Sequence, residues 1–408
     1  MKIFQVALGI LTAIGGFVDI GDLVTNGLVG ARYGLSLAWA TVLGTVGICL
    51  YAEMSGRVAA VTGRGTFDLV RERLGPRAGL ANLIASFLVT GLTLAAEIGG
   101  VALALELATS VNYLLWVPLV AFFLWLLIWR VKFSYLENGA GLLGLALLAF
   151  GFALWKLHPD YGSLVHQVVA PHKPGTERLN SYFYYAIALF GAAMTPYEVF
   201  FFSSGGVEEK WTRKDLMVER ANVLIGFPLG AMLSLSIAAC ATLVLKPRGI
   251  EVSTLGQIGL PVAFAAGKVA IAFLILGFVA ATFGAALETG LSCGYSIAQY
   301  FGWQWGKFVK PREASRFHLV VLLSLIGAAG LVLTTIDPVK ITEYSVVFSA
   351  VALPLTYFPI LVISNDPDYM GDKKNGRVMN FGATVFLVII VVASVAAIPL
   401  MIWTRAGQ

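Results

Sequence analysis

The sequence predicts an all-α membrane protein with about 11 transmembrane helices, and three features of the chain support this fold class. Of its 408 residues, 58% are hydrophobic and only 12% are charged, whereas an ordinary soluble domain has roughly 25% charged residues. Apolar runs of about 20 residues, the length that a helix needs to cross a bilayer, recur throughout. Lysines and arginines gather in alternate connecting segments. Together these features favour lipid over water as the solvent of the chain.

The apolar runs give the expected spans, and the whole chain, 1–408, is predicted to be one transmembrane domain. The first run is not expected to be a removable signal peptide, because it contains two acidic residues, lacks a small-residue cleavage site and continues directly into the second run. The predicted spans are 6–28, 34–56, 79–108, 112–129, 137–157, 182–204, 217–245, 263–299, 317–336, 341–363 and 377–403.

Positive charge predicts the orientation of these spans. With the N-terminus in the cytoplasm, nineteen lysines and arginines lie in inside segments and eight in outside segments. Cytoplasmic loops retain positive residues, so this excess supports a cytoplasmic N-terminus and an odd number of spans. The expected location is the plasma (inner) membrane. The net charge of +5 then reflects topology and does not indicate a nucleic-acid partner.

Two carboxylates, Asp19 and Asp22, lie near the middle of the first span. Each costs about 2–3 kcal/mol in hydrocarbon, so a functional role is the default expectation. Three residues apart on a helix they share one face, where their charges repel unless one is protonated or a cation lies between them. Gly15, Gly16 and Gly21 favour local unwinding, which would free carbonyl oxygens as further ligands for a hard cation.

The sixth span repeats this pattern. Pro196 removes a helical N–H near mid-span, and Glu198 is a further acid in the membrane, three residues after Thr195. A proline kink beside a satisfied acid would explain one such span alone. Interruptions in both the first and the sixth span instead predict an inverted repeat of spans 1–5 and 6–10, with a site at its interface. The repeats cover about 5–157 and about 182–363, and 377–403 is an additional helix.

Three further acids within predicted spans, Glu97, Glu288 and Glu53, are considered for a role. Glu97 and Glu288 have small neighbours, which is typical of close helix packing, and both are candidates for the ion path. Glu53 lies near the cytoplasmic end of its span and is expected to snorkel to the surface. The sequence contains no phosphate-binding loop, nucleophile–base pair or cofactor fingerprint, so neither an enzyme activity nor a cofactor is predicted.

At the two interruptions the chain resembles the Nramp family, manganese and iron transporters with eleven or twelve spans and a LeuT-type fold. The family carries Asp-Pro-Gly-Asn in the first span and Met-Pro-His-Asn in the sixth. The corresponding segments here are Asp19-Ile20-Gly21-Asp22 and Thr195-Pro196-Tyr197-Glu198. Further matches are Thr25-Asn26, Tyr33-Gly34, Leu353-Pro354, Met370-Gly371 and Asn375. The resemblance runs from the first to the eleventh span and implies a LeuT-type 5+5 inverted repeat with broken helices 1 and 6.

The departures from the family pattern predict a different ion preference. The sixth-span methionine of the family is a soft sulfur ligand that favours manganese and iron, and its position here is Thr195, a hard oxygen. The first-span asparagine has become Asp22, which adds a negative charge. Hard oxygen ligands favour Mg²⁺, which retains several waters. In this respect the chain resembles the Nramp-related magnesium transporters, a divergent branch of the family.

Proton coupling is also expected to be lost. The family's sixth-span histidine is Tyr197, a poor proton carrier at neutral pH. The third-span acids that the family uses as a proton route align with Ala104 and Leu107, although Glu97 is retained. The tenth-span glutamine that helps to hold the metal aligns with Val346.

The residues and the resemblance together predict a secondary transporter that imports Mg²⁺, and also Mn²⁺, by alternating access without proton coupling. The metal ion is the transported substrate, and the lipid bilayer surrounds the protein. The sequence predicts no particular oligomeric state. Two alternatives remain: a proton-coupled Mn²⁺/Fe²⁺ importer, and an amino-acid or organic-cation carrier on the same scaffold. The predicted metal contacts are Asp19, Asp22, Ala192 (through its carbonyl), Thr195 and Glu198, with Tyr197, Glu97 and Glu288 along the ion path.

Overall fold

The fold is a bundle of helices, and its spans agree with the predicted number. The computed structural model describes residues 9–11, 13–14, 17–131, 133–171, 175, 177–307 and 309–407, which form helices and connections without a strand. Nine helices in this part of the chain are long and apolar enough to cross a membrane, and a bent pair, Gly141–Lys156 with Tyr161–Val169, makes a tenth. One of the nine, Ile20–Thr62, holds part of the predicted first span and the whole second span. Counting it as two crossings gives the eleven spans expected from the sequence.

The spans are built from helices that are often interrupted by a short turn of different geometry. In chain order the elements are α2 (Ile20–Tyr33), η1 (Gly34–Leu37), α3 (Ala38–Thr62), α4 (Thr66–Thr109), α5 (Tyr113–Arg130), α6 (Phe133–Gly144), η2 (Leu145–Leu147), α7 (Leu148–Lys156), α8 (Tyr161–Val169), α9 (Leu179–Ala193), α10 (Pro196–Glu208), α11 (Leu216–Ala221), η3 (Asn222–Gly226), α12 (Phe227–Val244), η4 (Lys246–Arg248), α13 (Leu255–Phe301), α14 (Ser315–Leu333), α15 (Pro338–Asn365), α16 (Pro367–Met370), η5 (Gly371–Lys373) and α17 (Arg377–Trp403).

Two helices are longer than their predicted spans because each continues through a glycine kink. α4 bends at Gly75, whose φ is 84°, directly before Pro76, and α13 bends at Gly267, whose φ is 75°. Glycine adopts positive φ without the strain that a β-carbon would add. The predicted spans 79–108 and 263–299 therefore cover mainly the part of each helix that follows its kink.

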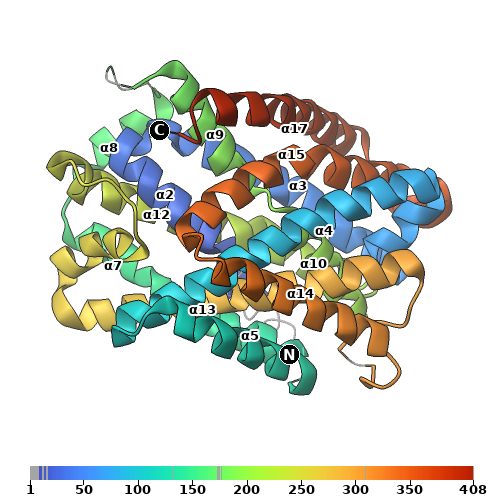
Figure 1. Cartoon of the computed structure of the whole chain (residues 1–408). Coiled ribbons are helices and arrows are strands. Elements are labelled where there is room, and N and C mark those ends of the chain that lie inside the picture. The colour runs from blue at the N-terminus through green and yellow to red at the C-terminus, as the bar shows by residue number, and fades with distance from the viewer. Residues whose placement is uncertain are drawn as a thin grey trace.

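The two longest helices make the most extensive helix–helix contact in the described part of the chain. α4 and α13 pack along each other, and α15 lies along α4 as well (Figure 1). α2 packs against α12, where Gly30 is in close contact with the backbone of Ala238. Lipid gives little hydrophobic drive for helices to associate, so such small residues bring helices into contact.

Segments that charge assigned to the same side of the membrane meet at the same end of the bundle. Arg57 of α3 donates hydrogen bonds to the backbone oxygen of Lys373 and to Oδ1 of Asn375, in the connection before α17. We call the end that carries these residues the arginine-rich face. Arg32 instead pairs with Glu177, Nε to Oε1 at 2.8 Å, among segments predicted on the opposite side. These contacts join segments that the predicted topology places on the same side of the membrane.

Candidate cation site between two helix interruptions

The first span is interrupted at the predicted acids. Val18 and Asp19 are non-helical, and α2 begins at Ile20. Asp19 caps this helix, because its Oδ1 accepts a hydrogen bond from the backbone N–H of Asp22 at 2.9 Å. Both acids are buried, with 2% and 1% of their surface exposed. Gly15 and Gly16, which were expected to favour this interruption, lie outside the described residues.

The sixth span is interrupted at the predicted proline. α9 ends at Ala193, and α10 begins at Pro196, where a missing N–H costs nothing because the first helical position has no intrahelical partner. Ala192 belongs to the last turn of α9, whose carbonyls have no partner within the helix. Thr195 Oγ1 donates a hydrogen bond to Glu198 Oε2 at 3.3 Å, in the first turn of α10.

The two interruptions face each other. Tyr197 of α10 donates its hydroxyl proton to Asp19 Oδ2 at 3.2 Å, which joins the two broken spans directly. Val346 of α15 lies beside both of them. A β-carbon on Gly21 would be 2.9 Å from its Cγ1, and one on Gly191 of α9 would collide with its backbone oxygen. The residue that aligns with the family's tenth-span glutamine therefore does stand next to the interruptions.

The two other predicted acids approach from the central helices. Glu97 of α4 is fully buried, and its Oε1 accepts a hydrogen bond from the backbone N–H of Ile20 at 3.2 Å. Glu288 of α13 is close enough to Asp19 and Glu198 for their charges to interact. The positive end of the α2 dipole thus receives two carboxylates, Asp19 and Glu97.

Five acidic side chains gather here with little compensation. None of the ion pairs formed by described residues includes one of them, and one oxygen each of Asp22 and Glu97 has no hydrogen-bond partner. Their oxygens do not converge, however: in the described part of the chain no three His, Cys, Asp or Glu side chains are placed to hold a metal ion together. An ion in this region would be bound by a mixture of carboxylate, hydroxyl and backbone oxygens. The five acids are Asp19, Asp22, Glu97, Glu198 and Glu288.

The structure adds polar contacts that sequence reasoning did not identify. Asn26 donates from Nδ2 to Oδ1 of Asp22 at 3.2 Å and to its backbone oxygen at 3.0 Å. Ser292 of α13 donates from Oγ to the backbone oxygen of Tyr197 at 3.3 Å. The spacing of four residues from Asp22 to Asn26 was a usable signal, since such residues share a helix face. Ser292 had no comparable signal, because it is distant in sequence.

The methionine closest in sequence to the sixth-span interruption is directed elsewhere. Met194 is completely buried, and its Sδ would lie 2.6 Å from a β-carbon placed on Gly47 of α3. It belongs to an apolar cluster with Phe386 of α17. Thr195, the next residue, presents its hydroxyl to Glu198 instead.

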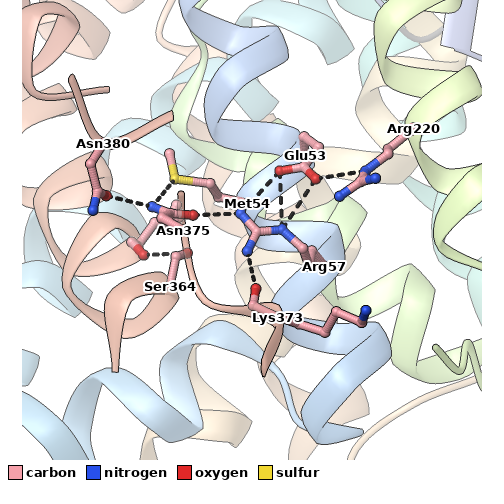
Figure 2. Close-up of polar contacts among 9 residues, drawn as sticks. Glu53, Met54, Arg57, Arg220, Ser364, Lys373, Asn375 and Asn380 are labelled. Carbon is pink, nitrogen blue, oxygen red and sulfur yellow. Dashed lines mark hydrogen bonds and ion pairs between the residues drawn. The ribbon is translucent and has the colours of Figure 1, made fainter. Parts of the chain in front are cut away.

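The prediction that Glu53 snorkels to the surface is wrong. Glu53 is only 3% exposed and accepts hydrogen bonds from Arg57 and Arg220 (Figure 2). Arg57, four residues along the same helix, keeps the carboxylate inside the bundle, and Arg220 reaches it from α11. A buried carboxylate with two guanidinium partners does not need to reach water.

Solved structures identify the fold class. A manganese transporter of Eremococcus coleocola superposes with a TM-score of 0.68 at 19% identity, covering 99% of this chain and 94% of that one. Mhp1, a nucleobase-cation-symport-1 family transporter, gives a TM-score of 0.62 at 15% identity, covering 97% and 92%. The chain thus has the LeuT-type fold, with its first and sixth spans broken.

The sequence identifies the family within that class. The model of the natural resistance-associated macrophage protein-like (Nramp) family matches residues 9–399, so the chain belongs to the Nramp family. A divalent metal cation transporter, MntH, from Erwinia tasmaniensis is 26% identical over 391 residues, covering 92% of this chain and 89% of that relative. MntH from Verminephrobacter eiseniae is 30% identical over 226 residues, covering 54% and 50%.

Proposed function

We propose that this protein is a secondary transporter that imports hard divalent cations, Mg²⁺ and also Mn²⁺, by alternating access. One observation carries the proposal: buried carboxylates without an ion-pair partner among the described residues gather between two opposed helix interruptions, where hydroxyl, amide and backbone N–H groups donate hydrogen bonds to them. Mg²⁺ binds through few carboxylates and retains waters. The names of the MntH relatives support a divalent cation as the substrate class. We propose no enzyme activity.

The individual roles extend the sequence predictions. Asp19, Asp22 and Glu198 supply charge, Thr195 a hydroxyl, and the carbonyl of Ala192 a neutral oxygen. Tyr197, Glu97 and Glu288 surround this site and shape its field. We place the N-terminus and the arginine-rich face in the cytoplasm, because positive residues remain inside, and we treat residues 5–157 and 182–363 as the two inverted repeats.

The electrical gradient is sufficient to drive import without protons. At about −100 mV, two charges moving inward gain roughly 4.6 kcal/mol, enough for about a thousandfold accumulation. Tyr197 replaces the family's histidine and donates a hydrogen bond to Asp19. Of the acids that form the family's proton route in the third span, this chain retains Glu97 alone. A relay with these gaps does not carry a stoichiometric proton.

The decisive experiment follows Mg²⁺ and H⁺ entry together in one preparation of proteoliposomes, with a membrane potential and no pH gradient. We expect Mg²⁺ entry without acidification of the lumen. Acidification that tracks metal entry, with Mg²⁺ excluded and Mn²⁺ accepted, would establish the proton-coupled importer instead. Uptake of an amino acid or organic cation in place of metal would establish the third alternative.

Thr195→Met is expected to move the preference from Mg²⁺ towards Mn²⁺. A thioether at this position adds a soft ligand and fills space that a hydrated ion needs. We expect the Mn²⁺:Mg²⁺ uptake ratio to rise about tenfold, which corresponds to about 1.4 kcal/mol. Thr195→Ser keeps the hydroxyl and serves as the control. An unchanged ratio in the methionine variant would remove Thr195 from the ion site.

A further inference from the structure

A second group of unpartnered oxygens lies at the arginine-rich face. Glu219 of α11 is fully buried, and neither of its carboxylate oxygens has a hydrogen-bond partner. Oδ1 of Asn222, three residues on, has none either. Residues three apart on a helix share a face. Two side chains on one helix face therefore carry three oxygens without a hydrogen-bond partner, and an ion or a water molecule is a usual explanation for buried polar atoms of this kind.

The nearby arginines do not occupy these oxygens. Arg57 donates from Nε and Nη2 to Glu53 at 3.1–3.2 Å, and Arg220 donates from Nε to the same carboxylate at 3.0 Å. Arg57 is held further by Asn375, as Figure 2 shows. Glu53 thus gathers both guanidinium groups, and the oxygens of the adjacent Glu219 contact neither of them.

Glu219 stands between helices that belong to the proposed transport path. A β-carbon on Gly56 of α3 would be 2.8 Å from Glu219 Oε1 and 2.6 Å from Cε1 of Phe202 in α10. α10 is the second half of the broken sixth span. The carboxylate is therefore wedged among α3, α10 and α11, at the end of the bundle that we place in the cytoplasm.

One continuous face joins Glu219 to the proposed ion site. Along α11, η3 and α12, this face recurs every three or four residues, and Ser234 at its far end lies beside Asp22. η3 is a π-helical turn, a geometry that is common at functional sites. The members of the face are Glu219, Asn222, Gly226, Gly230 and Ser234.

The leading half of the first span covers this face. We call its described residues, 9–11, 13–14 and 17, the leading half-helix. A β-carbon on Gly9 would be 2.5 Å from Nδ2 of Asn222, and one on Gly230 would be 2.6 Å from Cβ of Phe17. Gly226 meets Ala13 in the same way. The glycines let the leading half-helix pack tightly against η3 and α12, and Asn222 lies directly against Gly9.

We propose that Glu219 and Asn222 form a second binding station for the divalent cation, at the cytoplasmic end of its exit route. The helix face that carries Gly226 and Gly230 connects Asp22 and Ser234 with these oxygens. The ligand is a divalent cation that keeps most of its water, because the station offers one carboxylate and one amide oxygen. This inference rests on the proposed function and adds a site to it.

Flux measured from each face tests the station. In proteoliposomes with a single protein orientation, Glu219→Gln is expected to raise the KM for Mg²⁺ presented at the cytoplasmic face about tenfold. The KM at the external face should change less than twofold. Glu219→Asp keeps the charge and should restore most of the wild-type KM. Glu209→Gln, which replaces an exposed acid at the arginine-rich face, is the matched control. If Glu219→Gln changed neither KM value, or changed both by the same factor, the proposed station would be wrong.

Binding of Mn²⁺ provides a second readout that does not depend on transport. With free Mn²⁺ counted by its electron paramagnetic resonance signal, a variant carrying Asp19→Ala and Asp22→Ala should still bind one ion per chain. Adding Glu219→Gln, or Asn222→Ala if that variant does not fold, should abolish this binding. If the wild type carries no divalent cation, the proposed function fails; if it carries Mg²⁺ but the double variant binds no ion, only the station fails.

Discussion

Replacing Asp19 or Asp22 by alanine is expected to reduce Mg²⁺ uptake into proteoliposomes about 100-fold. Each substitution removes one charged oxygen contact to the ion, worth about 3 kcal/mol in a buried site, and 1.4 kcal/mol corresponds to a factor of ten. Initial uptake rates at fixed membrane potential measure the effect. Asp372→Ala changes an exposed aspartate at the arginine-rich face, 64% accessible, and should leave uptake unchanged.

Asp19 has two roles that a conservative variant separates. Its side chain caps α2 through the N–H of Asp22, and its charge contributes to the proposed site. Asparagine is an equally good helix cap, so Asp19→Asn keeps the cap and removes the charge. We expect uptake to fall nearly as far as in the alanine variant. Uptake within about threefold of the wild type would mean that Asp19 acts as a cap and not as an ion ligand.

The interruptions of the two spans were predictable because the residues that cause them act locally. Pro196 cannot continue the hydrogen-bond ladder of α9, and Asp19 has the chemistry of a helix cap. The positions of both interruptions therefore follow from the sequence to within a few residues. The opposition of the two interruptions was less secure, and rested on their matching positions in the repeats.

Features that depend on distant partners were not predictable. Glu53 and Arg57 are four residues apart, a spacing visible in the sequence, but Arg220 and Asn375 arrive from other spans and decide that the carboxylate is buried. The match of Gly226 and Gly230 to Ala13 and Phe17 likewise needs the packing of two helices that are far apart in the chain. Helix starts at 66 and 255 were missed because positive φ at a glycine can continue a helix at a new angle.

Glu53→Ala is expected to lower the free energy of unfolding by about 3–5 kcal/mol, because it leaves Arg57 charged and unpaired inside the bundle. The side chain of Arg57 is only 5% exposed, and that of Glu53 only 4%. Unfolding in mixed micelles at increasing SDS concentration measures the change. Glu72→Ala is the matched control: it breaks an ion pair with Arg64 whose side chains are 50% and 40% exposed, which is worth about 0–1 kcal/mol.

The pair can also be removed as a unit. A double variant with Glu53→Leu and Arg57→Met buries no charge at this position, so most of the lost stability should return. Arg220, whose side chain is 52% exposed, can be solvated without Glu53 and does not need replacement. If the single and double variants were equally unstable, the cost would lie in packing against α3 rather than in the unpaired guanidinium. If neither the single nor the double variant lost stability, Glu53 would not be the group that binds Arg57 and Arg220. Those arginines would then be available to Glu219.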